Sequence, residues 1–191
     1  MLARLGRIVQ ALKSFGLAER GVAVVEFALI LPIMLLVYLG SVEAGALIST
    51  DRKVQAVAGA IGDLVARADK SLTTAQMQDY FRAASGIMTP YSPDPVLQMV
   101  TVIAVDDSGG TKVLWSRQFQ NQTYSTHTAH AVNASYPLPK EMIAISKGRT
   151  VIAAEASYAY VPLFGLIFNQ PINLSRSSFY QPRSGGTITI N

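Results

Sequence analysis

Residues 20–45 read RGVAVVEFALILPIMLLVYLGSVEAG, and this stretch decides the fold of the amino-terminal part of the chain. Between residues 22 and 42 every residue is uncharged except Glu26. At a rise of about 1.5 Å per residue, a helix over 22–42 is about 31 Å long, which matches the hydrocarbon thickness of a membrane. The sequence therefore predicts a transmembrane helix over residues 22–42.

The basic charge of the chain gathers in front of this helix. The formal net charge is +4, and residues 1–20 contain four basic residues against one acidic residue, whereas the rest is nearly balanced. The four basic residues are Arg4, Arg7, Lys13 and Arg20. Because positive flanks stay in the cytoplasm, the amino terminus is predicted to be cytoplasmic and the rest to lie outside the inner membrane. A short patch of this kind also argues against a nucleic-acid-binding surface.

Composition excludes several classes of protein. Half of the 191 residues are hydrophobic and 15% are charged, so the chain is not a disordered one. It has no cysteine, which excludes disulfides, thiolate metal sites and cysteine nucleophiles. We find no Ser-His-Asp order, glycine-rich phosphate loop or recognisable pair of carboxylates, so neither enzyme activity nor a cofactor is expected.

Residues 43–69 continue the helical pattern as an amphipathic stem. Apolar side chains recur at heptad spacing, and polar side chains lie elsewhere around the helix. The stripe comprises Leu47, Thr50, Val54, Val57, Ile61, Leu64 and Ala68. Glycines and alanines in the same segment form a small-residue surface that permits close approach of a helix. The stripe is predicted to pack on the protein's own head.

Residues 70–191 are predicted to form a small α+β head. Capping residues at 71–76 favour a short helix that ends near Ala84. The predicted strands are 96–105, 112–119, 150–161 and 173–180. The turn-forming residues 106–110 favour a hairpin, and residues 122–148 are expected to form a short helix and loops. Because no long crossover helices separate the strands, the sheet is predicted to be antiparallel.

The carboxylate of Glu26 needs an explanation within so apolar a helix. A charged side chain costs roughly 3 kcal/mol at the centre of a bilayer, so it persists where it has a partner or a task. Gly21 lacks a Cβ, so its backbone is open to a protease. A cut after Gly21 would make Val22 the first residue and create an ammonium group there. In a bundle of parallel helices, that group could neutralise Glu26 of a neighbour.

This arrangement resembles the class III leader of type IV prepilins, with residues 1–21 as the leader. The string at 20–45, together with DRKVQAVAGAIGDLVARA at 51–68, resembles the TadE-like pseudopilins of the Flp (tight adherence) pilus. The run EASYAYVPLFGLIFNQPINLSRSSFYQPR at 155–183 is similar to the carboxy-terminal tail of that family. The two stretches leave the middle of the chain without a resemblance.

The resemblance implies a structural function and a set of partners. Prepilin peptidase would cut between Gly21 and Val22, and Glu26 would be the carboxylate needed for assembly. The protein would be a minor pilin-like component in the assembly of a Flp/Tad pilus. It would contact the major Flp pilin, other minor pilin-like proteins and the Tad membrane platform.

Two alternatives to a processed pilin-like protein remain open. One is an uncleaved bitopic scaffold or binding protein with a periplasmic head. The other is ordinary secretion, which the poor cleavage site at residues 42–44 and the early Glu26 disfavour. Pro32 removes one backbone hydrogen bond and favours a kink, which either permits local melting during assembly or is simply a tolerated membrane proline.

Three other groups of residues have plainer explanations. His127 and His130 are spaced as two metal ligands would be on a helix, but no further ligand stands nearby, so surface histidines are expected. Residues 106–110 resemble half of a cation-binding loop and fit a turn better. The aromatic side chains of the carboxy-terminal segment are Tyr158, Tyr160, Phe164, Phe168, Phe179 and Tyr180. They suit a core, with residues 162–168 as an alternative exposed docking patch.

Overall fold

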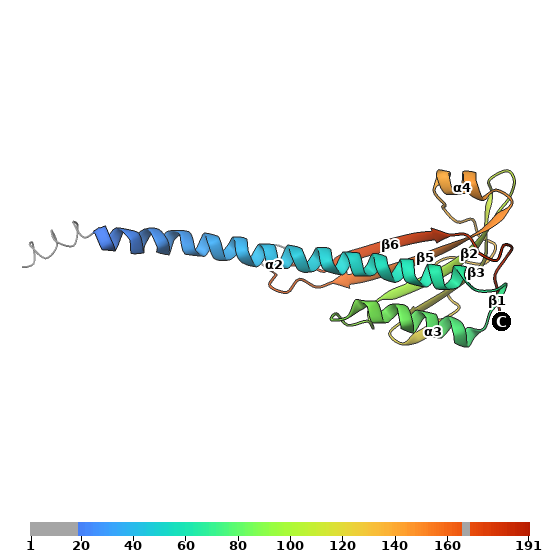
Figure 1. Ribbon diagram of the computed structural model, residues 1–191, viewed down its shortest axis with the longest axis horizontal. Helices are drawn as coiled ribbons and strands as arrows, with labels where there is room; N and C mark the ends of the chain where they lie inside the picture. Colours follow the sequence, from blue (N-terminus) through green and yellow to red (C-terminus); the bar gives the residue numbers. More distant parts are fainter. Residues whose placement is uncertain (1–18, 166–168) are drawn as a thin grey trace, which may run out of the picture. The chain divides into compact units, whose positions relative to one another are not determined.

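The computed structural model describes residues 19–165 and 169–191. The chain divides into two compact units, Met1–Gly45 and Ala46–Asn191. We call the second unit the head. It contains the stem residues from Ala46 onward as well as the strands, and Figure 1 shows its elements with their labels. The α+β fold class with a long amino-terminal helix and a small antiparallel sheet is confirmed.

Helix α2, Glu19–Ala66, is continuous and includes Pro32. It ends at Ala66, short of the predicted stem boundary at residue 69. The segment after β6 provides a hydrogen-bond partner at this end of the helix, because the Arg183 backbone N–H donates to the Ala66 carbonyl at 2.9 Å. The Ser184 hydroxyl likewise donates to the Ala68 carbonyl at 3.3 Å. Carbonyls at a helix end need such partners when the helix stops inside a folded unit.

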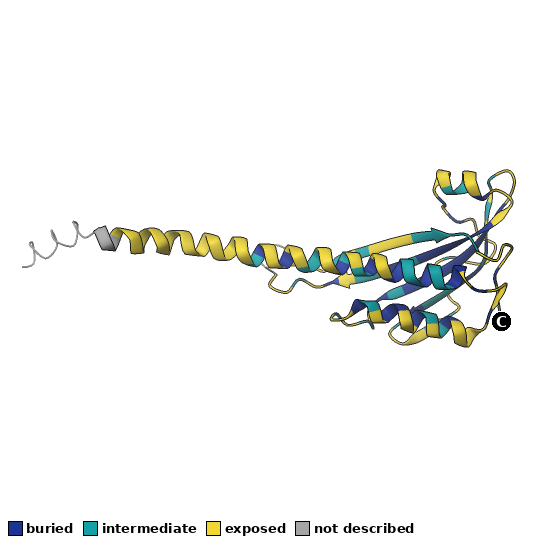
Figure 2. Cartoon of the chain, in the orientation of Figure 1, coloured by how far each residue is buried: buried dark blue, intermediate teal, exposed yellow. Residues whose placement is uncertain are grey.

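The stem part of α2 packs on the strands of the head, as the heptad pattern predicted. Val54, Val57 and Ile61 are 0% exposed. Each such aliphatic side chain contributes roughly 1.5–3 kcal/mol when it is buried. Figure 2 shows this part of α2 with buried residues facing the strands, whereas residues 22–38 are exposed throughout.

The main sheet has five antiparallel strands. They are β2 (Leu97–Val105), β3 (Thr111–Gln120), β4 (Thr123–Ser125), β5 (Arg149–Tyr160) and β6 (Ile172–Tyr180). Their order across the sheet is β4-β3-β2-β5-β6, and every pairing is antiparallel. The four predicted strands and the β2–β3 hairpin are therefore confirmed, while β4 falls in a region expected to lack strands.

Two helices cover one face of this sheet. The core there joins α2 and α3 (Thr74–Ser85) to the strands, and it includes Phe81, which stacks on Phe119 with ring centroids 5.6 Å apart. A capping box between Thr73 and Gln76 starts α3, as the capping residues at 71–76 predicted. A 3-10 helix, η1 (Gly86–Met88), follows α3.

The opposite face of the sheet is covered over part of its length. Tyr136 and Leu138 from the segment after β4 pack there on Ile103 and Val151, together with Ile143 of the short helix α4 (Lys140–Ser146). This helix and its flanking loops were expected within residues 122–148. The head is thus a sheet between two layers, with the thicker layer formed by α2 and α3 (Figure 1).

The end of the chain closes the head in a way the sequence did not indicate. Strand β7 (Thr189–Ile190) pairs in parallel with β1 (Ser71–Leu72) in a separate two-stranded sheet. The indole N–H of Trp115 donates to the Ile188 carbonyl at 2.7 Å, and Ile188 is 0% exposed. The last residues are therefore part of the core of the head.

Helix α2 contacts Tyr180 of β6 at two glycines. The Tyr180 hydroxyl donates to the Gly59 carbonyl at 2.9 Å. A Cβ placed on Gly62 would lie 2.4 Å from Cε2 of Tyr180 and 3.0 Å from Cβ of Ala154. These two glycines therefore make room for an aromatic ring from a strand, whereas the small-residue surface was predicted to permit close approach of a helix.

Candidate functional site

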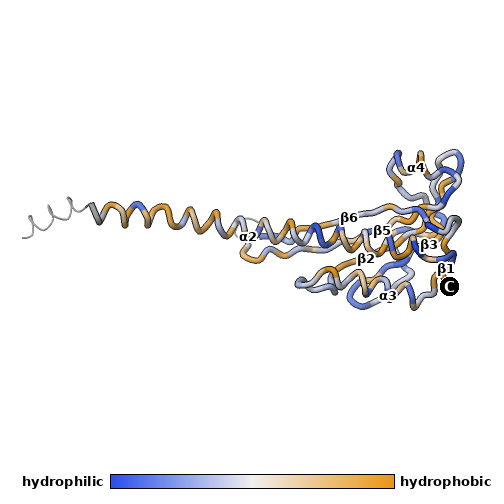
Figure 3. The backbone as a smooth tube through the Cα atoms, viewed as in Figure 1, coloured by the Kyte–Doolittle hydropathy of each residue, from blue (hydrophilic) through white to orange (hydrophobic). Residues whose placement is uncertain are grey.

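The amino-terminal part of α2 presents apolar side chains in every direction. All residues from Val22 to Tyr38 are exposed, and the tube in Figure 3 is hydrophobic along most of this stretch. Within the described part of the chain, one helix is long and apolar enough to cross a membrane, and it contains this stretch. A helix that is apolar all round is stable when lipid or other helices surround it. The arrangement is compatible with a single-pass membrane protein.

Glu26 is the single charged residue between Val22 and Val42. Its side chain is exposed, and it has no hydrogen-bond or ion-pair partner among residues 19–165 and 169–191. A carboxylate on such a surface therefore needs a partner from another molecule or another part of the chain once water is removed. Pro32 lies in the same exposed stretch, six positions later.

Gly21 and Val22 lie in the first turn of α2, which begins at Glu19. Backbone N–H groups in a first helical turn have no partner within the helix, so this turn opens more easily than the turns after it. Val22 and Glu26 are four positions apart and so lie one above the other on one side of the helix. The structure thus brings together the three residues that the sequence selected, at one end of an apolar helix.

The residues at 106–110 form a turn, as expected. The Asp106 carboxylate accepts hydrogen bonds from the Ser108 hydroxyl at 2.6 Å and from the Gly110 backbone N–H at 2.7 Å. The Gly110 carbonyl accepts from the Asp106 N–H at 2.9 Å, and Gly109 has a φ of 93°. The hydrogen bond from the Ser108 hydroxyl has the largest effect on the Asp106 carboxylate, followed by that from the Gly110 N–H. Both lower the pKa of Asp106 below its ordinary value of 3.8.

The lowered pKa of Asp106 predicts a pH dependence of the β2–β3 hairpin. A carboxyl group whose pKa is lower in the folded state stabilises that state above its unfolded pKa, and this contribution is lost as the pH falls through the folded pKa. The free energy of unfolding should therefore decrease more between pH 5 and pH 2 in the native chain than in Asp106→Asn. Denaturant titrations across this range measure the difference, with Asp107→Asn as the control of equal charge. Parallel pH profiles for the native chain and Asp106→Asn would contradict the prediction.

The structure places the two histidines in different surroundings. Neither lies on a helix, and His127 is exposed with its backbone N–H bonded to the Ser125 hydroxyl at 3.0 Å. His130 instead lies 2.9 Å from the Glu155 carboxylate through Nε2. Among the described residues, no three histidine, aspartate or glutamate side chains gather closely enough to hold a metal ion.

Glu155 is the polar residue that sequence reasoning missed. Its Oε1 accepts a hydrogen bond from the Tyr136 hydroxyl at 3.1 Å, and the His130 and Tyr136 rings are 4.6 Å apart. Burial and the nearby Glu155 carboxylate raise the pKa of Tyr136 well above its ordinary value. The one signal in the sequence was a carboxylate within an otherwise uncharged predicted strand. The contacts of His130 and Tyr136 with Glu155 hold the segment before α4 against β5.

The aromatic residues of the carboxy-terminal segment divide between core and surface. Tyr160 is 2% exposed, and Tyr158, Phe179 and Tyr180 pack against the two core clusters, so the core interpretation is correct for these. Val161 and Leu163 are mostly exposed and Phe164 is half-exposed, which agrees with an exposed segment after β5. Phe168 lies outside the described residues.

The comparison with protein families agrees with this part of the structure. Residues 21–61 match the family model described as TadE-like protein, and the match extends from Gly21 into the stem. It does not extend to the tail at 155–183. No curated protein and no solved structure matches the chain. Over residues 21–61, from the glycine before the apolar helix to the buried stripe of the stem, this chain is similar to the TadE-like family.

Proposed function

We propose that this protein is a minor pilin-like component that takes part in assembly of a Flp/Tad-type pilus. The observation that supports this is the TadE-like match over the residues that contain Gly21, Glu26 and the exposed apolar helix. The protein crosses the inner membrane once, with its basic amino terminus in the cytoplasm and its head in the periplasm. Its function is structural, not enzymatic, and involves the major Flp pilin, other minor pilin-like proteins and the Tad platform.

Processing by prepilin peptidase is the first step of the proposed function. The bond between Gly21 and Val22 lies in the first turn of α2, where the least backbone hydrogen bonding must be broken to present an extended substrate. Cleavage creates an ammonium group on Val22 and removes the whole basic patch. The remaining chain can then leave the cytoplasmic face without carrying its arginines through the apolar layer.

Assembly of apolar helices is the second step. In a bundle of parallel helices, the new ammonium group of one subunit pairs with Glu26 of a neighbour. The pairing is strong there because the surroundings have a low dielectric constant and no water competes. The two groups would also fix the axial register of neighbouring helices, because a charge in lipid tolerates little displacement from its partner.

The mass of the protein recovered from membranes tests the processing step. A chain that begins at Val22 is expected from native cells, and the full chain is expected from cells that lack prepilin peptidase. Gly21→Ile should accumulate as the full chain because its side chain blocks access to the backbone. The matched control is Ala23→Ile, which places the same side chain one residue after the new amino terminus. Native protein that starts at residue 1 would instead support an uncleaved periplasmic scaffold.

A further inference from the structure

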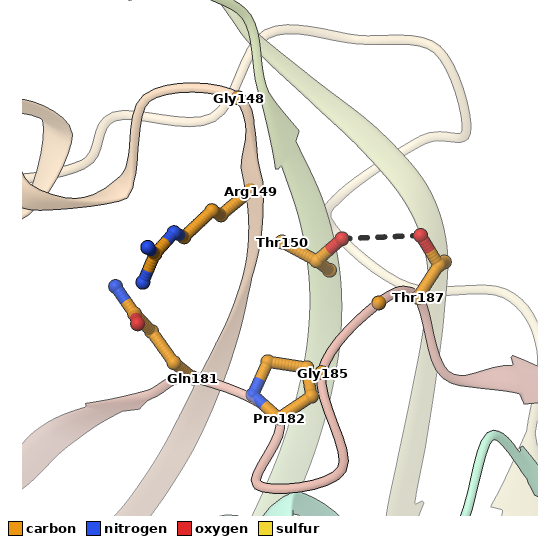
Figure 4. Close-up of a pocket in the computed structure, with 8 residues that line it drawn as sticks. Gly148, Arg149, Thr150, Gln181, Pro182, Gly185 and Thr187 are labelled. Carbon is orange, nitrogen blue, oxygen red and sulfur yellow. Dashed lines mark hydrogen bonds between the residues drawn. The ribbon is translucent and has the colours of Figure 1, made fainter.

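A pocket of about 260 Å³ opens in the head between the start of β5 and the loop that follows β6. Its walls are formed by Arg149 and Thr150 on one side and by Gln181, Pro182 and Thr187 on the other, with three glycines between them. Figure 4 shows the Arg149 and Gln181 side chains extending from the two walls toward one another. All of these residues belong to the head, and none takes part in the proposed processing or membrane anchoring.

Arg149 gives the pocket an uncompensated positive charge. It is exposed and has no ion pair or hydrogen-bond partner among the residues that the structure describes. By contrast, the guanidinium of Arg183, from the same loop, contacts Asp63, and that of Arg176 lies 2.7 Å from Asp51. A free guanidinium presents several N–H donors in a plane, a geometry that matches a carboxylate.

Gln181 adds an acceptor beside this donor. Its amide nitrogen donates to the Ile145 carbonyl at 3.3 Å and to the Ser146 hydroxyl at 3.0 Å. Because a carbonyl can only accept, these contacts fix the orientation of the amide. Its oxygen accepts no hydrogen bond from any residue in 19–165 or 169–191. A ligand must therefore supply a negative group for Arg149 and an N–H donor for Gln181.

The walls of the pocket are held in place before any ligand binds. The hydroxyls of Thr150 and Thr187 lie 3.2 Å apart and join the loop to β5 (Figure 4). The loop is also fixed by the Trp115 bond to Ile188 and the Arg183 bond to Ala66. Gly185 and Gly186 have φ angles of 70° and 86°, a backbone conformation that glycine adopts without strain. Little conformational entropy is lost when such a site is filled.

We propose that this pocket binds the free carboxyl-terminal end of a partner protein chain. The terminal carboxylate pairs with Arg149, and the last backbone N–H donates to the side-chain oxygen of Gln181. A phosphate ion fits less well, because it faces an acceptor oxygen and has no N–H group to offer it. The carboxylate of Asp107, which lies beside Gly148, also disfavours a ligand of higher charge.

Peptide binding to the full-length protein in detergent micelles tests the proposal. The probe is a fluorescein-labelled alanine pentapeptide with a free carboxyl end, followed by fluorescence polarisation. We expect saturable binding that weakens at least about tenfold when the same peptide is amidated, since a charge-assisted bidentate contact is lost. The Arg149→Gln variant should show the same loss, and Gln181→Leu should weaken binding of the free-ended peptide.

The control variant is Lys147→Gln, which removes the same charge two residues earlier, outside the pocket lining. It should bind the peptide as the native protein does, and the fluorescence of Trp115 should show that all variants are folded. Absence of saturable binding, or equal binding of the free and amidated peptides, would overturn the proposal. An amidated peptide with an internal glutamate that binds as well as the free-ended one would also overturn it.

Discussion

Replacement of Gly62 by alanine is expected to lower the free energy of unfolding of the head by up to about 2 kcal/mol, because overpacking costs about 1–3 kcal/mol and the gain in helix propensity offsets part of it. The new methyl group would lie 2.4 Å from a ring carbon of Tyr180, so the ring must move. Its movement strains the hydrogen bond from the Tyr180 hydroxyl to Gly59. Alanine favours a helix over glycine by about 1 kcal/mol, and this gain is smaller than the expected steric cost.

The single tryptophan of the chain, Trp115, lies in the head and reports its unfolding by fluorescence. In a Tyr180→Ala background, Gly62→Ala should cost close to nothing, because its main steric partner is gone. Gly45→Ala is the control, since nothing lies within 4 Å of a Cβ placed there. A loss of stability in Gly62→Ala that persists unchanged without the Tyr180 ring would show that the ring contact is not its cause.

Under the proposed function, Glu26→Gln is expected to reduce pilus assembly at least about tenfold while membrane insertion stays normal. Glutamine has nearly the same size as glutamate but is uncharged, so it cannot form an ion pair with an ammonium group. In lipid the free energy lost with an ion pair is several times RT. The measurements are the amount of protein in the membrane fraction, the amount of surface pili and co-purification with the major pilin.

A conservative variant separates charge from shape at the same position. Glu26→Asp keeps the charge with a shorter side chain and should retain part of the assembly. Val25→Leu, its neighbour on the apolar surface, should assemble normally. If Glu26→Gln forms pili at the native level, the proposed pairing between subunits is wrong, whatever the result of the processing experiment.

Local patterns predicted most of the elements because each depends on near neighbours in the sequence. The apolar run around Glu26, the heptad stripe through Val54 and Ile61, and the turn at Asp106 all express the geometry of one helix or one hairpin. The strands of the antiparallel sheet follow from the same kind of pattern. The residues selected for processing and assembly lie together for this reason too, because all of them belong to one end of α2.

What could not be predicted depends on residues that are distant in the sequence. Three such contacts join separate elements of the head. They are the contact of His130 with Glu155, the packing of the Tyr180 ring against Gly62, and the hydrogen bond from the Trp115 indole to the Ile188 carbonyl. The heptad spacing of apolar residues indicates that a glycine lies on a packed face of the helix. It does not indicate which side chain packs against that glycine. The pocket around Arg149 is of the same kind, since β5 and the loop after β6 form it jointly.

The pairing of β7 with β1 has a consequence for the order of events during synthesis. Residues 189–190 pair with residues 71–72, so this contact joins residues far apart in the sequence and forms only after residues 189–190 have been made. The apolar helix at 22–42 leaves the ribosome far earlier. Under the proposed function, insertion into the bilayer therefore precedes completion of the head. Until the head is complete, its apolar segments are exposed in the nascent chain and need protection by chaperones.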